Sequence, residues 1–177
     1  IDRINATRDD DFLILKGIEC DILEAGPMDL PDEVLEQADW VIASVHFGQK
    51  QPRQQITDRI TGALENPHID IIAHPTGRLI NRREAYEVDM EAVFQAAKEN
   101  KKMLELNANP VRLDLHDIHC AMARERNIPI IISSDAHKIS GLDVMKYGIK
   151  QARRGGLTGE HVANTKSWVE LQRLLSK

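Results

Sequence analysis

Short runs of Val, Ile and Leu alternate along this chain with longer segments in which apolar residues recur at helical spacing. This alternation is typical of parallel strands joined by crossover helices, so it predicts an α/β fold. The joints between these segments are short, which favours a single domain. The strands are expected at residues 12–18, 40–45, 69–73, 103–106 and 128–133. The first helix is expected to start at Pro31. Further helices are expected at residues 56–64, 89–99, 115–126, 141–153 and 166–175.

Composition narrows the class of protein. The 177 residues are 42% hydrophobic and 29% charged, which is enough apolar material for one core. The formal charge of −5 argues against a general grip on nucleic-acid phosphates, so any such contact must be local. Cys20 and Cys120 form no C-x-x-C pair, which fits a reducing cytoplasm, and no apolar run is long enough for a membrane span. The first residue is Ile1 and not Met, so we expect this chain to be part of a longer protein.

Ionisable residues follow the ends of the predicted strands. Glu19 follows the first strand, His46 the second and His74 the third, while Asp135 and His137 follow the last. The carboxyl ends of the strands of a parallel barrel meet on one face, where active sites are built. Imidazole and carboxylate groups suit zinc, manganese or iron, and metal ions held in this way can activate water against a phosphate ester. The pattern therefore predicts a metal-dependent hydrolase of phosphate esters, although each histidine alone could simply cap a strand end.

Longer strings surround these five residues and extend beyond them. They are KGIECDIL (16–23), ASVH (43–46), ENPHIDIIAHPTGR (65–78), ELNANP (105–110), RLDL (112–115), SSDAH (133–137), DVMKYG (143–148) and ARRGGLT (152–158). Together they cover nearly the whole chain. They resemble the PHP (polymerase and histidinol phosphatase) domain that ends the bacterial family X DNA polymerases.

The resemblance implies a distorted (β/α)7 TIM-like barrel with a trinuclear centre of divalent transition metals, Zn²⁺ or Mn²⁺ with Fe²⁺ as a further candidate. It implies that Glu19 bridges two metals and that His46 and His74 complete the second of them. By the same resemblance Asp135 joins Glu19 at the first metal, and His137 belongs to the third. In these polymerases the domain is associated with 3′–5′ exonuclease and related phosphoesterase activity.

The chain departs from the family pattern at its start. The family opens its barrel with an H-x-H pair on the first strand, and nothing like this pair lies upstream of Glu19. We therefore expect residues 1–177 to be the C-terminal portion of a single PHP domain that lacks its first strand or strands. On its own this portion would complete only the Glu19, His46 and His74 site and would be nearly inactive. We also expect strand 12–18 to have an unpaired edge, which favours self-association or an N-terminal segment that refolds over the opening.

Several other polar residues follow strand ends. Arg78 is predicted to hold a substrate phosphate, and together with Glu19 and Asp135 it completes the expected catalytic set. Arg82, Arg83 and Arg112 are either further phosphate ligands or solvated loop charges. Asn107 and Asn109 are expected to orient loops or waters. His116 and His119 are expected on the surface, and His68 and His161 to be structural or solvated.

Three functions stay open from the sequence. The first is the exonuclease or phosphatase module of a family X polymerase, acting on DNA 3′ ends with a polymerase domain upstream in the parent chain. The second is a stand-alone phosphatase for small phosphate esters, similar to histidinol-phosphate phosphatase. The third is a PHP domain that has lost catalysis and serves as a structural or interaction module.

Overall fold

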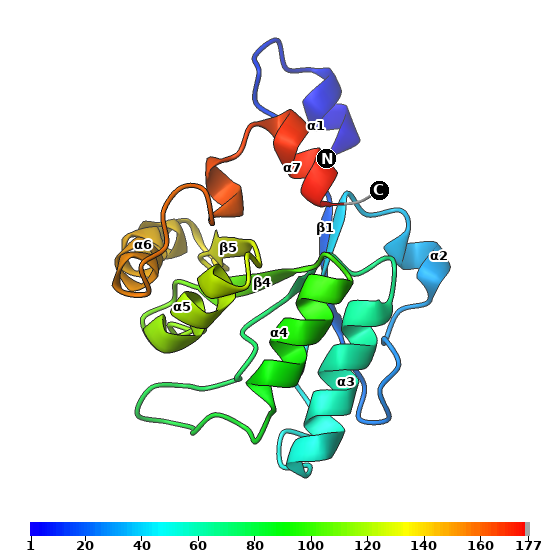
Figure 1. The fold of residues 1–177 in the computed structure, drawn as a ribbon. Helices are drawn as coiled ribbons and strands as arrows, with labels where there is room; N and C mark the ends of the chain where they lie inside the picture. Colours follow the sequence, from blue (N-terminus) through cyan, green and yellow to red (C-terminus); the bar gives the residue numbers. More distant parts are fainter. Residues whose placement is uncertain (176–177) are drawn as a thin grey trace.

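The computed structural model describes residues 1–175, and it contains a five-stranded sheet flanked by helices (Figure 1). Every pairing in the sheet is parallel, and the strands lie side by side in chain order. The α/β class predicted from the sequence is therefore confirmed. The strands are β1 (Gly17–Asp21), β2 (Trp40–Ser44), β3 (Ile71–Ile72), β4 (Met103–Asn107) and β5 (Ile130–Ser133).

This strand order is that of part of a TIM-like barrel wall. A closed barrel would need a ladder between its two edge strands, and within residues 1–175 no such ladder joins β1 to β5. Both strands are therefore sheet edges, and the seven-stranded barrel stays a prediction. None of the helices in this part of the chain combines the length and the apolar character that a membrane crossing needs.

The helices follow the predicted segments, with shorter pieces added at both ends of the chain. Asp89, predicted as the first residue of its helix, instead caps it by accepting hydrogen bonds from the backbone N–H groups of Glu91 and Ala92. The α-helices are α1 (Asp2–Ala6), α2 (Asp32–Leu35), α3 (Arg53–Glu65), α4 (Met90–Glu99), α5 (Asp117–Glu125), α6 (Met145–Arg154) and α7 (Trp168–Leu174). Two 3₁₀ turns, η1 (Ile139–Val144) and η2 (Ala163–Thr165), complete the elements.

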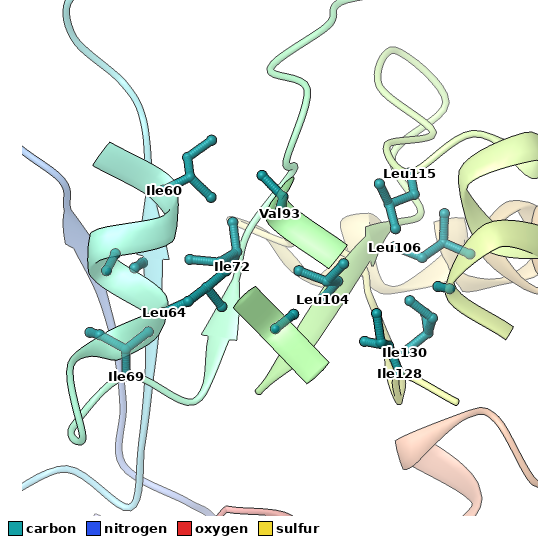
Figure 2. Close-up of a cluster of buried hydrophobic side chains, with 14 of the residues drawn as sticks. Ile60, Leu64, Ile69, Ile72, Val93, Leu104, Leu106, Leu115, Ile128 and Ile130 are labelled. Atoms are coloured by element: carbon teal, nitrogen blue, oxygen red, sulfur yellow. The ribbon is translucent and has the colours of Figure 1, made fainter. Parts of the chain in front are cut away.

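The main core lies between the sheet and helices α3 to α5. Figure 2 shows apolar side chains from α3, from α4 and from the central strands converging there. Buried aliphatic side chains contribute roughly 1.5–3 kcal/mol each, so this layer is what holds the central strands in place. A second, smaller cluster covers the other face of the sheet with Ile71, Met103 and Ile131, against η2 and α7. Because both faces are covered, β4 is buried along its whole length.

The predicted first strand is wrong over most of its length. β1 begins at Gly17, where it pairs with Trp40, and not at residue 12. The cause is local, because the side chain of Asn5 donates to the carbonyl of Ile14 at 2.8 Å and accepts from its N–H at 3.0 Å. The chain at Ile14 is thereby bonded to the segment around α1, and Phe12 is 62% exposed. The edge strand on this side of the sheet is consequently Gly17–Asp21.

Candidate metal centre at the sheet rim

Three predicted ligands meet at the carboxyl ends of neighbouring strands. Glu19 lies on β1, His46 follows β2 and His74 follows β3. The Oε1 atom of Glu19 is 3.3 Å from Nε2 of His74 and 3.6 Å from Nε2 of His46. One ligand atom from each residue can be chosen so that all three lie within 4.8 Å of one another, and no other such group occurs in residues 1–175. The rim thus has the donor set of a metal site, with two imidazoles and one carboxylate.

Strand alternation explains why Glu19 faces the rim. The neighbouring Cys20 is buried in the core, so Glu19 and Asp21 project from the opposite face of β1. Asp21 was not predicted from the sequence to be a site residue. Its Oδ1 lies 2.5 Å from Nδ1 of His46, and the hydroxyl of Ser44 lies 3.2 Å from the same nitrogen. The spacing of two residues from Glu19 was the sequence signal that could have found it.

Asp21 fixes which nitrogen of His46 can bind a cation. A carboxylate can only accept, so its contact with Nδ1 requires the proton of a neutral imidazole to be on that atom. The lone pair is then on Nε2, the nitrogen that faces Glu19. Carboxylate partners of this kind orient and strengthen histidine ligands in metal sites.

A buried carboxylate fixes the backbone of His74. Its backbone has a left-handed conformation with φ of 28°, and its N–H donates to Oε2 of Glu105 at 2.5 Å. Ser133 donates to the other oxygen of Glu105. The His74 side chain is only 3% exposed, and its Nδ1 has no hydrogen-bond partner among the described residues. A buried polar atom without a partner is unusual in folded proteins, and here it is the ring nitrogen other than the Nε2 that faces Glu19.

Glu19, His46 and His74 form a triad of candidate ligands. Within it, the contact between Glu19 and His74 shifts the pKa of both residues. The hydrogen bond with His74 is the main cause that lowers the pKa of Glu19, against the opposing effect of burial. Burial by itself would lower the pKa of His74, but the bond with Glu19 and the charge of Glu105 together raise it. Without a cation, therefore, the Glu19 carboxylate stabilises a proton on His74. A divalent cation fits the same place because it supplies the positive charge that this proton otherwise carries.

The other two predicted ligands lie outside the triad. Asp135 follows β5, where its Oδ2 accepts from Nδ2 of Asn107 at 3.2 Å and lies 3.8 Å from Nε of Arg112. The His137 side chain is 86% exposed, and its Nδ1 contacts the backbone carbonyl of Asp135 at 2.9 Å. Neither residue shares the ligand group of Glu19, His46 and His74. Their roles as metal ligands stay predictions.

The arginines at the rim have different surroundings. Arg78 donates through Nε to the carbonyl of Arg112 at 2.9 Å and through Nη2 to that of Leu113, so its guanidinium joins two loops. Nε of Arg112 lies 3.8 Å from Oδ2 of Asp135, and its charge acts to lower the pKa of His74. Its buried Nη1 has no hydrogen-bond partner in residues 1–175. The phosphate roles considered for Arg78 and Arg112 stay predictions.

The surface placement predicted for His116 and His119 is wrong. Both side chains are partly buried, and their rings stack with centroids 3.9 Å apart. The other neighbour of His119 is Phe94, which it meets edge-on at 6.0 Å. Burial, followed by the charges of His116 and Arg78, lowers the pKa of His119 to about 4. Both histidines lie at the start of α5, where His116 is the capping residue. Helical spacing alone did not reveal that His119 contacts Phe94 of α4.

Fold and rim together define an α/β protein with a candidate metal site at the carboxyl ends of its parallel strands. The chain is 45% identical over all 177 residues to the DNA polymerase/3′–5′ exonuclease PolX of Bacillus subtilis strain 168, and it covers 31% of that protein. It is 34% identical over 162 residues, or 86% of its length, to a probable phosphatase of Thermoanaerobacter sp. strain X514, of which it covers 64%. A probable phosphatase of Acetivibrio thermocellus is 36% identical over an alignment of 132 residues, which covers 70% of this chain and 52% of that protein.

These similarities confirm the resemblance to the PHP domain of the bacterial family X DNA polymerases. The chain spans about a third of the first relative and just under two thirds of the second. No protein-family model matches the chain.

Proposed function

We propose that this chain is the C-terminal portion of one PHP domain, residues 1–177, and that this domain is a metal-dependent phosphoesterase. The observation that carries the proposal is the convergence of Glu19, His46 and His74 at three neighbouring strand ends. The names of the relatives, an exonuclease and several phosphatases, support hydrolysis of phosphate esters. The strand order of the sheet is compatible with a barrel that further strands complete.

The residues of the rim would have different roles in such a site. Glu19, His46 and His74 would hold a divalent cation, Zn²⁺ or Mn²⁺ with Fe²⁺ as a further candidate. A cation bound there supplies a binding point for phosphate oxygens and lowers the pKa of water. Asp21 keeps the proton of His46 on Nδ1, and Arg112 has donors left for a phosphate oxygen.

The finer form of the proposal is a 3′–5′ exonuclease or phosphatase module of a cytoplasmic family X DNA polymerase. It is supported by the identity of 45% to a relative named as a DNA polymerase and 3′–5′ exonuclease, of which this chain covers 31%. The polymerase domain would lie upstream in the parent chain, and DNA 3′ ends would be the substrate. In that form Asp135 and His137 would serve further metals of a trinuclear centre.

A small-molecule phosphatase is the second candidate function. The observation that favours it is the match to probable phosphatases, which extends over 86% of the chain for one of them. A substrate panel separates the two candidates. A 3′-labelled oligonucleotide should be shortened by the exonuclease, whereas sugar and amino-alcohol phosphates should be the preferred substrates of the second candidate. Metal binding without hydrolysis of either class by the parent protein would favour a module that has lost catalysis.

Metal content tests the proposal directly. Protein purified without chelator should contain transition metal by elemental analysis, because the triad offers three well-placed donors. His74→Ala should lose most of that metal, while the matched control His161→Ala, in the loop after α6, should keep it. Equal metal content in His74→Ala and in the unsubstituted chain of residues 1–177 would refute the triad as the metal site.

A further inference from the structure

A cavity of about 260 Å³ lies at the amino ends of β4 and β5. Lys102 directly precedes β4 and Pro129 directly precedes β5, and both residues line the cavity. The rest of the wall comes from the end of α4, the loop before β5 and the helix α7. We call this space the basic cavity, because its lining includes the cationic side chains of Lys98, Lys101, Lys102 and Arg173.

The basic cavity is separate from the candidate metal centre. The triad of Glu19, His46 and His74 lies at the carboxyl ends of the strands, whereas the cavity lies at the amino ends. β4 has five residues, so at about 3.3 Å per residue the two ends of the sheet are roughly 15 Å apart. Active sites of parallel barrel proteins lie at the carboxyl ends, so a ligand of the basic cavity would not be the substrate.

Positive charge gathers around this cavity without a carboxylate in its lining. Four of the lining residues are basic and none is acidic. Within residues 1–175, none of Lys98, Lys101 and Arg173 takes part in an ion pair. The carboxylates of Glu99 and Glu170, which are close to them in sequence, accept hydrogen bonds from other neighbours. Like charges that converge in this way repel one another, so an anion between them would be stabilising.

The carboxyl end of α4 explains only part of this cluster. Cations are favoured near the C-terminus of a helix, and Lys98 lies in the last turn of α4. Lys102 comes after the helix, however, and it is only 8% exposed, with its ammonium donating to the carbonyl of Pro67 at 3.3 Å. Arg173 comes from α7, a different element. The end of α4 therefore does not account for the whole cluster, whereas an anion bound between these elements does.

We propose that the basic cavity binds a small, multiply charged anion of the phosphate or diphosphate class. Its volume is slightly below the roughly 300–1,000 Å³ that is usual for small-molecule sites, which suits such an anion. Guanidinium and ammonium groups are the side chains that bind phosphate oxygens in proteins. A nucleic-acid backbone fits less well, because the chain has a formal charge of −5 and these cations converge on one small cavity. The bound anion would tie α7 to the end of α4.

Pyrophosphate is the probe, and the chain is first freed of metal so that no cation at the rim can bind it. Titration in about 0.15 M salt should give saturable shifts in the backbone amide resonances of Lys101, Lys102 and Asn127. Arg173→Gln should weaken binding about tenfold because a charge-assisted hydrogen bond is lost. The side chain of Arg173 is exposed, so this substitution should leave the fold intact. Arg153→Gln, at an exposed position on α6, is the matched control and should bind like the unsubstituted chain.

The outcomes do not depend on the proposed phosphoesterase function, because the titrated chain holds no metal. Saturable shifts around the basic cavity that both Arg173→Gln and Lys98→Gln weaken would support the inference. Absence of saturable shifts, or shifts confined to the rim around His74, would overturn it. Equal affinity of Arg173→Gln and the unsubstituted chain would also overturn it. An oligothymidylate that binds at the same residues more tightly than pyrophosphate would overturn the small-anion assignment in favour of a nucleic-acid backbone.

Discussion

Replacing Asp21 by Asn should weaken metal binding although Asp21 is not itself expected to be a ligand. The carboxylate is 2.5 Å from Nδ1 of His46 and keeps Nε2 free to bind a cation. An Asn side chain has nearly the same shape but no charge. It can also turn its amide N–H₂ toward Nδ1, which would move the ring proton to Nε2 and block the ligand position.

The magnitude follows from the exposure of the pair. Removal of such a supporting partner typically costs 10–100-fold in metal affinity, or about 1.4–2.7 kcal/mol. The side chains of His46 and Asp21 are 40% and 23% exposed, so water can replace part of the lost interaction. The hydroxyl of Ser44 also remains as a partner of Nδ1. We therefore expect the lower end of the range, a loss of about tenfold.

Competition with a chromophoric zinc chelator at constant pH measures this affinity. Asp58→Asn, on the surface of α3, is the matched control and should bind zinc like the parent chain. Urea unfolding of the metal-free proteins should show whether Asp21→Asn has disturbed the fold. If Asp21→Asn retains zinc affinity within twofold of the parent, the assigned role of Asp21 is wrong.

Three further predictions concern pH, assembly and activity. The folded pKa of His119, about 4, lies below its ordinary 6.5, so stability should be complete above pH 6.5 and fall as the pH drops toward 4. The shift corresponds to at most about 3.4 kcal/mol, reduced to about 1–2 because the ring is partly exposed, and urea unfolding of His119→Phe should lack this loss. Light scattering should show self-association through the β1 edge, which Ile18→Lys should reduce; a parent chain that stays monomeric at high concentration would contradict this. Finally, a full-length parent protein with Mn²⁺ should hydrolyse substrate while this chain is nearly inert, and comparable turnover would show that upstream ligands are not needed.

Much of the fold could be predicted because the positions of the central strands depend on the burial of their apolar residues. β2, β4 and β5 begin or end within two residues of the predicted positions, since their apolar runs are buried between two layers. The first strand could not be predicted in the same way. Residues 12–15 form an apolar run too, but the side chain of Asn5 bonds both backbone groups of Ile14. A polar contact across nine residues is invisible to periodicity.

The candidate site, like the fold, could be predicted only in part. Strand ends and residue types were enough to predict that Glu19, His46 and His74 converge. They were not enough to find Asp21, because its role depends on the distance to His46, or Glu105, because a charge within an apolar strand has no partner that sequence can reveal. The stacking and partial burial of His116 and His119 could not be predicted, because helical spacing does not show what lies against a helix.

Two buried carboxylates fix the backbone of the loop that follows β3. Glu105 accepts the N–H of His74, and Asp114 accepts the N–H of Thr76 two residues later. Burial raises the pKa of both acids, so these bonds and the nearby positive charges are what stabilise their ionised forms. The same bonds hold His74 in a left-handed backbone conformation that a non-glycine residue rarely adopts.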